Sequence, residues 1–383
     1  MAEDGQAVHI RSLQAAFREE GHEVEEVSLV KQGDAGDSQA AKPSEAGRNR
    51  WSFVSKLPRF AHELAEYAYS PIARSRILKA AIEFEPDFLY ERYAFGNTAG
   101  VMAAHRLKKP LVLEVNSPMV LELQKTRGLS LPALAKRMET YIFTQADRVC
   151  VVTDVLKGML MEMGVKEERL LVTPNGVRLE LYSFDDPAAQ RESARADLGI
   201  AATSGLVLGF VGYYRDWHRL DLVIECLTDP KLSEAQLVLI GMGPVEDGLR
   251  ELANKLGVSD RVHFPGPRPH EAIPGLLTAF DIALVPAINP YASPLKLHEY
   301  MAAGLAVVAP DQPNLREVLT DRENGLLIQP GEKDALLAAL VTLASDNALR
   351  AELGSNALRT IHDMELTWTG NARRVVQAVG ELP

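Results

Sequence analysis

The feature that most constrains the fold is a succession of short apolar runs that alternate with helical patterns from residue 110 onward. Each run is rich in Val, Ile and Leu and is apolar at consecutive positions. Parallel strands that helices cover on both faces have this pattern. The runs are residues 111–115, 149–153, 170–174, 206–211, 236–240, 262–264, 282–285, 306–309 and 325–328. The sequence therefore predicts a doubly wound α/β chain.

Length and composition favour two domains. The chain has 383 residues, 46% of them hydrophobic, which is more than one core usually organises and enough to bury two. Between residues 181 and 204 the strand and helix pattern gives way to a polar, Ala-rich stretch that contains Asp185, Asp186 and Pro187. We place the boundary there, with an N-terminal domain over residues 1–182 and a C-terminal domain over residues 183–363.

The start of the chain departs from this pattern. Residues 5–17 indicate a loop that enters a helix, and residues 21–29 indicate a turn followed by a strand. The strand expected before Gly5 is missing, although the first strand of a doubly wound sheet usually lies near its middle. We expect a late start site or a trimmed chain, or another segment that fills the gap. Residues 31–50 indicate a polar loop, and residues 51–85 indicate two helices broken near Pro71.

Composition excludes several classes of function. With 41 basic and 52 acidic residues the net charge is −11, which argues against nucleic acid as a partner. Cys150 and Cys226 lie in apolar runs and are expected to be buried thiols in a reducing cytosol. No apolar run approaches the ~18 residues of a membrane span, and the first residues do not form a signal peptide. We find no paired-cysteine or His-Glu-x-x-His metal motif, no Walker loop and no Gly-x-Ser-x-Gly elbow.

Residues 293–299 place a positive charge where the start of a helix should repel it. Ser293 is predicted to be the N-cap and Pro294 the first helical residue, followed by Leu295. Lys296 then lies in the first turn, where the macrodipole disfavours a cation unless an anion is bound. Free amides, dipole and Lys296 would form a phosphate cradle, and Glu299 could accept hydrogen bonds from sugar hydroxyls. The alternative is a capped amphipathic helix with a solvated Lys and Glu.

Residues 209–218 form a predicted strand that runs into a loop. In open α/β sheets ligands bind at the carboxyl ends of strands. Arg215 and His218 are therefore candidate phosphate contacts, and Gly212 and Tyr213 are predicted to border the same ligand. The alternative is a surface Arg beside a packed Trp-His pair.

Two further strand ends carry small residues. Residues 240–244, Ile-Gly-Met-Gly-Pro, lack the third glycine of a dinucleotide fingerprint, because Glu246 occupies its position. Gly243 is instead predicted to let the chain turn tightly beside a ligand. Residues 264–268 end in Arg268 and could let a base lie against the backbone, or they could form a rigid turn.

The first half of the chain offers candidates for a second substrate. Glu91, Arg92, Glu114 and Asn116 follow two predicted strands and would face one cleft if both strands lie in one sheet. Each could instead be a helix cap or a turn residue. Residues 174–177, Pro-Asn-Gly-Val, are predicted first as a turn and only secondarily as a ligand contact.

Five separated segments together resemble family 4 of the retaining glycosyltransferases, the glycosyl transferases group 1, of GT-B fold. They are residues 172–177, 209–212, 239–244, 293–304 and 324–328, in the family's order. The resemblance implies two Rossmann-like domains that face a cleft, with a nucleotide-diphosphate sugar held mainly by the second. It also implies that a final helix, within residues 364–383, crosses back onto the first domain.

The resemblance implies roles for individual residues. Glu299 matches the second glutamate of the family's paired-glutamate motif and would hold the donor ribose, whereas Tyr291 occupies the place of the first. Tyr213 and His218 stand where many members have the diphosphate-binding Arg and Lys. Arg215, His218 and Lys296 would then supply the positive potential for catalysis. Asn116 lies about where many relatives carry an acceptor-side His, and Gly5 resembles the glycine loop near the donor phosphates.

The expected function is a retaining transfer of a sugar from a nucleotide-diphosphate sugar to a hydroxyl acceptor, without a metal cofactor. The acceptor would be a sugar, a lipid-linked molecule or a small metabolite. A nucleotide-sugar epimerase and a non-catalytic partner in a glycan-assembly complex are the alternatives. We expect a cytoplasmic protein with at most peripheral contact at the inner face of a membrane, through residues 51–77, although internal packing of that segment is favoured.

Overall fold

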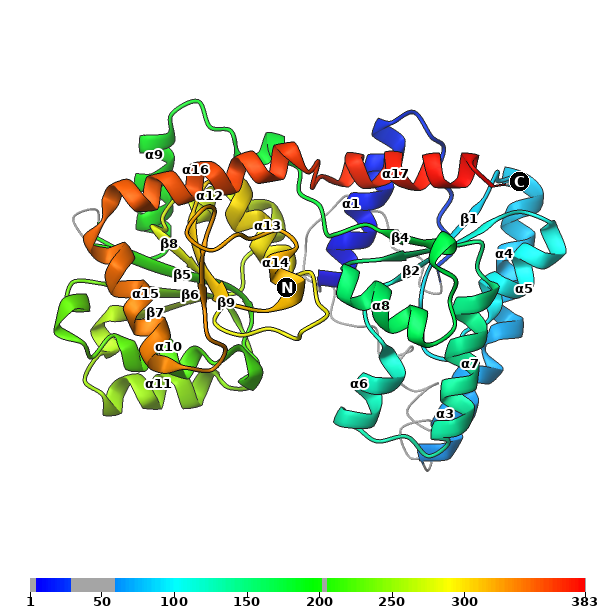
Figure 1. Cartoon of the computed structure of the whole chain (residues 1–383), viewed down its shortest axis with the longest axis horizontal. Helices are drawn as coiled ribbons and strands as arrows, with labels where there is room; N and C mark the ends of the chain where they lie inside the picture. Colours follow the sequence, from blue (N-terminus) through cyan, green and yellow to red (C-terminus); the bar gives the residue numbers. More distant parts are fainter. Residues whose placement is uncertain (1–4, 29–58, 202–204, 383) are drawn as a thin grey trace, which may run out of the picture. The chain divides into compact units, whose positions relative to one another are not determined.

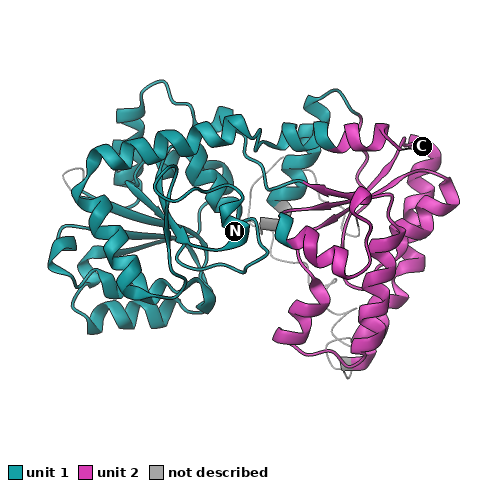
Figure 2. Cartoon of the chain, in the orientation of Figure 1, with its two compact units in different colours: residues 1–22, 153–155, 173–374 teal, residues 23–152, 156–172, 375–383 magenta. Residues whose placement is uncertain are grey.

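The computed structural model describes residues 5–28, 59–201 and 205–382. They form two compact units, which Figure 2 colours separately. Unit 1 comprises residues 1–22, 153–155 and 173–374, and unit 2 comprises residues 23–152, 156–172 and 375–383. The domain boundaries at 182/183 and 363/364 remain a prediction. The longest segment of unit 1 begins at Thr173 and ends at Arg374.

Unit 2 contains a four-stranded parallel sheet with its strands in chain order, part of which is labelled in Figure 1. The strands are β1 (Leu89–Arg92), β2 (Leu111–Val115), β3 (Arg148–Val151) and β4 (Leu170–Val172). The helices are α3 (Arg59–Ala68), α4 (Ser70–Phe84), α5 (Ala99–Leu107), α6 (Met119–Thr126), α7 (Pro132–Gln145) and α8 (Asp154–Glu162). Every residue of β2 is buried, as the continuous apolar run predicts. The predicted break between two helices falls at Tyr69.

The start of the chain differs from the expectation. Helix α1 (Gly5–Glu19) begins at Gly5 itself, and a turn follows at Gly21. Residues 22–28 carry no helix or strand in the described structure, and residue 29, the end of the predicted strand, lies outside the described residues. β1 is an edge strand of the described sheet. The loop predicted over residues 31–50 lies outside the described residues.

Unit 1 contains a six-stranded parallel sheet in the order β10-β9-β8-β5-β6-β7. The strands are β5 (Val207–Tyr213), β6 (Gln236–Met242), β7 (Val262–Gly266), β8 (Ile282–Leu284), β9 (Ala306–Pro310) and β10 (Leu326–Ile328). The helices are α9 (Pro187–Asp197), α10 (Leu220–Cys226), α11 (Glu246–Lys255), α12 (Ile273–Leu277), α13 (Leu295–Ala302), α14 (Pro313–Arg316), α15 (Lys333–Ser345) and α16 (Asn347–Asp363). The last helix, α17 (Trp368–Gly380), is divided, with residues 368–374 in unit 1 and residues 375–380 in unit 2. This confirms the doubly wound prediction.

Two separate cores cover the faces of this sheet. Val207 belongs to one core and Leu208 to the other, because successive side chains of a strand point to opposite faces. Apolar side chains therefore cover both faces of the sheet, and we look for functional polar side chains at the ends of its strands.

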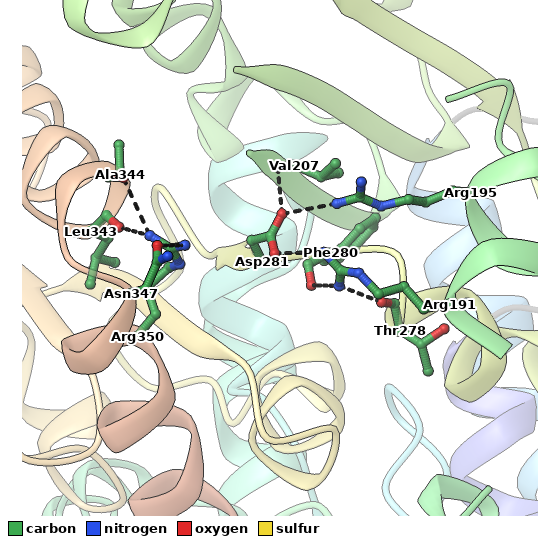
Figure 3. A network of polar contacts seen from close by, with 10 residues as sticks. All are labelled: Arg191, Arg195, Val207, Thr278, Phe280, Asp281, Leu343, Ala344, Asn347 and Arg350. Atoms are coloured by element: carbon green, nitrogen blue, oxygen red, sulfur yellow. Dashed lines mark hydrogen bonds and ion pairs between the residues drawn. The ribbon is translucent and has the colours of Figure 1, made fainter. Parts of the chain in front are cut away.

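Asp281 fastens α9 to the amino ends of β5 and β8 (Figure 3). Its carboxylate accepts hydrogen bonds from the Val207 amide at 2.8 Å, from Arg191 at 2.6 Å and from Arg195 at 3.2 Å. A partly buried carboxylate needs such partners to offset its desolvation. The charge of Asp281 is thereby paired within the amino end of the sheet.

The turn predicted at residues 174–177 is not formed. Residues 173–176 carry no turn, and Val177 forms a parallel bridge with Thr367. A Cβ on Gly176 would lie 2.4 Å from the backbone nitrogen of Trp368, so glycine is needed for the close approach of two chain segments. The long-range pairing overrides the local preference of Asn-Gly for a turn.

Candidate active site

The strand order of unit 1 reverses between β5 and β8, which are neighbours in the sheet. From β5 the chain moves outward to β6 and β7, then returns to the other side of β5 as β8. At such a switch point the segments that follow the two strands diverge, and ligands bind at their carboxyl ends. The segment after β5 carries residues 214–218, and the segment after β8 leads into α13. The two sequence segments predicted to hold phosphate therefore meet at this place.

Lys296 is the second residue of α13 and reaches back to β5. Its Nζ lies 3.8 Å from the centroid of the buried Phe210 ring. It also lies 2.9 Å from where a Cβ on Gly212 would be, and Gly212 has a φ of +140°. Burial lowers the pKa of Lys296 to about 7, while the charge of Glu299 opposes the shift. In the described structure this ammonium has no hydrogen bond or ion pair.

The start of α13 differs from the prediction by one residue. The helix begins at Leu295, and Pro294 is its N-cap residue without a side-chain cap in the described structure. The Ser293 hydroxyl instead accepts a hydrogen bond from the Asn175 amide at 3.3 Å, and the Asn175 side chain bonds the Ser293 carbonyl. Ser293 is therefore not a cap, because a segment distant in sequence engages it. The first amides of the helix, which have no intrahelical partner, remain available to an anion.

His218 lies beside Lys296 and is buried. Its Nδ1 accepts a hydrogen bond from the Arg215 amide at 3.3 Å, which leaves the proton of the neutral ring on Nε2. Burial, followed by the charges of Lys296 and Arg215, lowers the pKa of His218 to about 3. His218 is therefore a neutral hydrogen-bond donor rather than the positive charge that the resemblance implies.

Arg215 is exposed and lies over two aromatic rings. Its Cζ is 4.6 Å from the centroid of the Tyr213 ring and 5.3 Å from that of Trp217. No ion pair with a carboxylate occurs among the residues that the structure describes. Arg219 and Arg250 of the same unit, in contrast, pair with carboxylates at 3.0 Å and 2.8 Å. The positive charge of Arg215 is thus left uncompensated beside Lys296.

Glu299 lies on α13, one turn beyond Lys296, and is 6% exposed. Its Oε1 lies 2.7 Å from His270 Nε2. Burial of Tyr182 raises the pKa of that tyrosine, and the negative charge of Glu299 raises it further. Glu299 and Leu295 border a small pocket within unit 1. The other lining residues are Val8, Ser12, Gly176, Val177, Arg178, Leu181, Tyr182, His270, Pro274 and Trp368.

Gly241, near the end of β6, and Gly243, just after it, let the carboxyl ends of β5 and β6 approach each other closely. A Cβ on Gly243 would lie 2.2 Å from the carbonyl oxygen of Tyr214, and one on Gly241 would lie 1.9 Å from that of Gly212. The Tyr214 amide donates to the Met242 carbonyl at 2.8 Å. Gly243 therefore packs the loop after β6 against the loop that carries Arg215, so that it acts on the candidate site through backbone packing.

For two other predicted donor contacts, Arg268 and Gly5, the structure shows the local surroundings. Arg268 donates to the backbone carbonyl of Asp197 at 3.3 Å and pairs with the Asp197 carboxylate at 3.4 Å, at the end of α9. Gly5 is the first residue of α1 rather than part of a loop in the described residues. Their roles as donor contacts remain predictions.

Glu114 is the centre of a polar cluster in unit 2. Its carboxylate pairs with Arg92 at 3.3 Å, accepts a hydrogen bond from the Tyr90 hydroxyl at 2.8 Å and is bonded by the Asn116 amide. Arg92 and Glu114 are register partners on β1 and β2, so their side chains share one face of the sheet. The structure thus brings three of the four predicted acceptor-side residues together.

Glu91 does not join them, because consecutive residues of a strand face opposite sides. Its Oε1 accepts a hydrogen bond from Asn97 at 3.1 Å, and a Cβ on Gly100 would lie 1.9 Å from its Oε2. Burial raises the pKa of Glu91 to about 7, although the Gly100 amide favours the charged form. The expectation that Glu91 faces the same cleft as Arg92, Glu114 and Asn116 is therefore wrong.

Sequence reasoning missed the aromatic rings that hold the cations. The sequence indicated Phe210 only as a buried strand residue, and it predicted Tyr213 as a residue beside the ligand rather than as a partner of a cation. Alternation along β5 could have indicated Phe210, since it lies two residues before Gly212 and on the same face. His270 gave no signal, because its contact with Glu299 joins distant segments.

Metal ligands, membrane-spanning helices and cysteines were also considered in the sequence. In residues 5–28, 59–201 and 205–382, no three His, Cys, Asp or Glu side chains gather in a way that could hold a metal ion. None of the helices in these ranges has the length and apolar character needed to cross a membrane. Cys150 and Cys226 are both buried thiols, as predicted.

Two α/β units with parallel sheets are the architecture of the GT-B glycosyltransferases. A model of the family described as "Glycosyl transferases group 1" matches residues 190–360, and one described as "Glycosyltransferase Family 4" matches residues 4–181. The two matches together span most of the chain. The chain therefore belongs to this family of glycosyltransferases, and it is an enzyme of that class.

Curated relatives and solved structures agree with this assignment. A D-inositol 3-phosphate glycosyltransferase of Salinispora arenicola is 27% identical over 81% of this chain and 71% of its own length. One of Nocardia farcinica is 28% identical over 76% and 66%. HepE of Anabaena in complex with UDP has a TM-score of 0.69 and 22% identity over 81% of this chain and 82% of its own. A sucrose-phosphate synthase of Thermosynechococcus elongatus has a TM-score of 0.70 and 20% identity over 98% and 92%.

Proposed function

We propose that this glycosyltransferase moves a sugar from a nucleotide-diphosphate sugar to a hydroxyl acceptor with retention of the anomeric configuration. One observation carries the proposal. At the switch point of the unit 1 sheet, Lys296 and Arg215 have aromatic rings but no carboxylate partners in the described structure, and they flank an uncapped helix start. A diphosphate is the ligand that would satisfy all these groups at once.

The chemistry follows from the charge that develops on the leaving group. As the bond between sugar and phosphate breaks, negative charge accumulates on the departing diphosphate. Lys296, the first amides of α13, Arg215 and the Nε2 proton of His218 are proposed to stabilise this charge. Groups fixed in place before the reaction need no reorganisation, so such stabilisation is effective. The acceptor hydroxyl is proposed to arrive on the same face of the sugar.

Glu299 is proposed to accept hydrogen bonds from the donor ribose. Its hydrogen bond with His270 fixes one carboxylate oxygen and leaves the other for a hydroxyl. In unit 2, Arg92 and Asn116, both bonded to Glu114, are proposed to contact the acceptor. The names of the inositol 3-phosphate glycosyltransferases support a polar acceptor with several hydroxyls. We propose that cationic groups of the protein, rather than a metal ion, meet the diphosphate, and that the enzyme acts in the cytoplasm or at the inner face of a membrane.

The test separates turnover from donor binding. A thermal-shift panel of nucleotide sugars, including UDP-glucose and GDP-mannose, first identifies the donor that stabilises the protein. Lys296→Met is then expected to lower kcat about 100- to 1000-fold, the usual loss when one preorganised charge-stabilising group is removed. Glu299→Gln is expected chiefly to weaken donor affinity, measured by calorimetry with the same nucleotide sugar.

The control is Arg219→Ala, which removes a cation of the neighbouring turn that already pairs with Asp221. It should leave kcat and donor affinity near those of the wild type. Unchanged turnover in Lys296→Met would refute the cradle. Conversion of the donor sugar in the absence of any acceptor would contradict the transfer reaction and indicate an epimerase.

A further inference from the structure

Unit 1 exposes apolar side chains mainly at one place. Its exposed large hydrophobic residues, among those described, are Ile10, Tyr213, Trp217, Met242 and Met364. Three of them belong to the ends of β5 and β6 and the loop between β5 and α10. Tyr213 is 49% exposed and Trp217 is 47% exposed, and Tyr213 is the register partner of Met242. Exposed aromatic rings that gather beside a ligand site indicate a role there.

The rings of Tyr213 and Trp217 both contact Arg215. The guanidinium lies over the faces of Tyr213 and Trp217, at 4.6 Å and 5.3 Å. A ring attracts a cation through its quadrupole and carries no net charge, so it restrains the side chain without neutralising it. A carboxylate would hold Arg215 as firmly but would compete with an anionic ligand. A guanidinium whose faces lie against aromatic rings keeps its N–H groups, which point outward in its plane, for hydrogen bonds.

The same arrangement occurs at Lys296, whose Nζ lies over Phe210 at 3.8 Å. Arg250 gives a useful contrast in the same unit. It lies over Phe264 at 4.1 Å, but it also pairs with Glu246 at 2.8 Å. Among these three cations, only Arg215 and Lys296 lie over a ring without also pairing with a carboxylate in the described structure.

We propose that Tyr213 and Trp217 are positioning residues that hold Arg215 by its faces and direct its N–H groups toward the diphosphate of the donor. This inference rests on the proposed function and deepens it. It also gives Tyr213 a role other than direct phosphate contact. The positive charge that many family members carry at this position lies two residues later in this chain, and the Tyr213 ring supports it there.

The experiment measures UDP affinity by calorimetry, with GDP as a second probe, and kcat with the donor found in the thermal-shift panel. Tyr213→Leu and Trp217→Leu are each expected to weaken the better-bound nucleotide about 2- to 5-fold, and the double variant about tenfold. Tyr213→Phe and Trp217→Phe keep a ring and are expected to restore most of the lost affinity. The loss should shrink at high salt, because it concerns a charge.

A double-mutant cycle distinguishes positioning from a merely structural role. In an Arg215→Ala background, the two leucine substitutions are expected to have no further effect on affinity or kcat. Arg250→Ala is the matched control, since it removes an Arg from a ring outside the site, and it should leave nucleotide affinity unchanged. Circular dichroism and the thermal midpoint establish that each variant is folded.

The outcomes separate this inference from the proposed function. If the leucine variants bind UDP and GDP like the wild type while Arg215→Ala binds them weakly, the positioning role is wrong and the cradle stands. Equal losses from the leucine substitutions with and without Arg215 would also overturn it. If Arg215→Ala and Lys296→Met both bind the nucleotides normally, the proposed function itself fails.

Discussion

Lys296 and Arg215 share one property: each lies over an aromatic ring, and neither forms an ion pair in the part of the chain that the structure describes. For Arg215, which is exposed, solvent screens the charge and leaving it unpaired costs little. For Lys296 the cost is larger, because burial disfavours the ammonium and lowers its pKa to about 7. A bound diphosphate would restore the charged form. Binding and protonation should therefore be linked at this residue.

The expected consequence is proton uptake when UDP binds. At about pH 8 a lysine with a pKa near 7 is mostly neutral in the free protein, whereas the bound pyrophosphate raises its pKa toward the ordinary value of 10.5. Binding should then take up close to one proton, and UDP affinity should fall as the pH rises above about 7. Below that pH the lysine is already charged and uptake should vanish. Calorimetry in buffers of different ionisation enthalpy measures the number of protons.

Lys296→Met is the control, since it cannot take up the proton. His218 should not contribute, because its pKa of about 3 keeps it neutral throughout this range. A binding heat at about pH 8 that does not depend on the buffer would contradict the linkage.

At the scale of elements, the sequence predicted strands better than their ends. The runs at 111–115 and 236–240 appear as strands because dry parallel strands leave a continuous apolar pattern that no distant contact can hide. The N-cap at Ser293 and the turn at 174–177 were wrong for a common reason. Asn175 bonds Ser293, and Val177 pairs with Thr367, so each local preference is overridden by a contact between distant segments.

This explanation makes a prediction about Gly176. An added Cβ would lie 2.4 Å from the Trp368 nitrogen and 2.5 Å from the Thr367 carbonyl carbon, and backbone atoms cannot rotate away. Gly176→Ala is therefore expected to separate the two segments and to lower the free energy of unfolding by about 1–3 kcal/mol. Urea unfolding followed by circular dichroism measures the change.

The matched control is Gly248→Ala in α11, where a Cβ would have no atom within 4 Å. Because alanine favours a helix over glycine, this variant should be more stable by about 0.5–1 kcal/mol. If Gly176→Ala were as stable as the wild type, glycine would not be required for the pairing of Val177 with Thr367.

At the scale of the whole molecule, the sequence predicts the fold class but not that the first residues of the chain belong to unit 1. Residues 1–22 group with residues 173–374, and the contact of the His9 ring with Trp368, at 4.6 Å between centroids, is one cause. For the candidate site, the sequence likewise predicts individual residues but not the contacts between them. Lys296 and His218 were predicted from separate segments, whereas their common contact with Phe210 depends on the neighbouring positions of β5 and β8. No local pattern contains that information.

The pH dependence of overall stability depends on Glu91, which lies off the acceptor-side cluster. Its pKa of about 7 exceeds the ordinary value of 4.5, so the folded protein binds more protons than the unfolded chain between these values. Stability therefore falls as the pH rises through this window, and at about pH 8 the buried carboxylate costs up to about 3 kcal/mol. Glu91→Gln stays neutral. It should be more stable than the wild type at about pH 8, and the difference should vanish below about pH 5.

Urea unfolding of both proteins across this range measures the difference in the free energy of unfolding. Glu139 and Glu317, whose pKa values burial also raises, are present in both proteins and cancel in the difference. Parallel pH profiles for the wild type and Glu91→Gln would show that Glu91 is charged in the folded protein near neutral pH, so that the buried face of β1 would have to contain a partner for it.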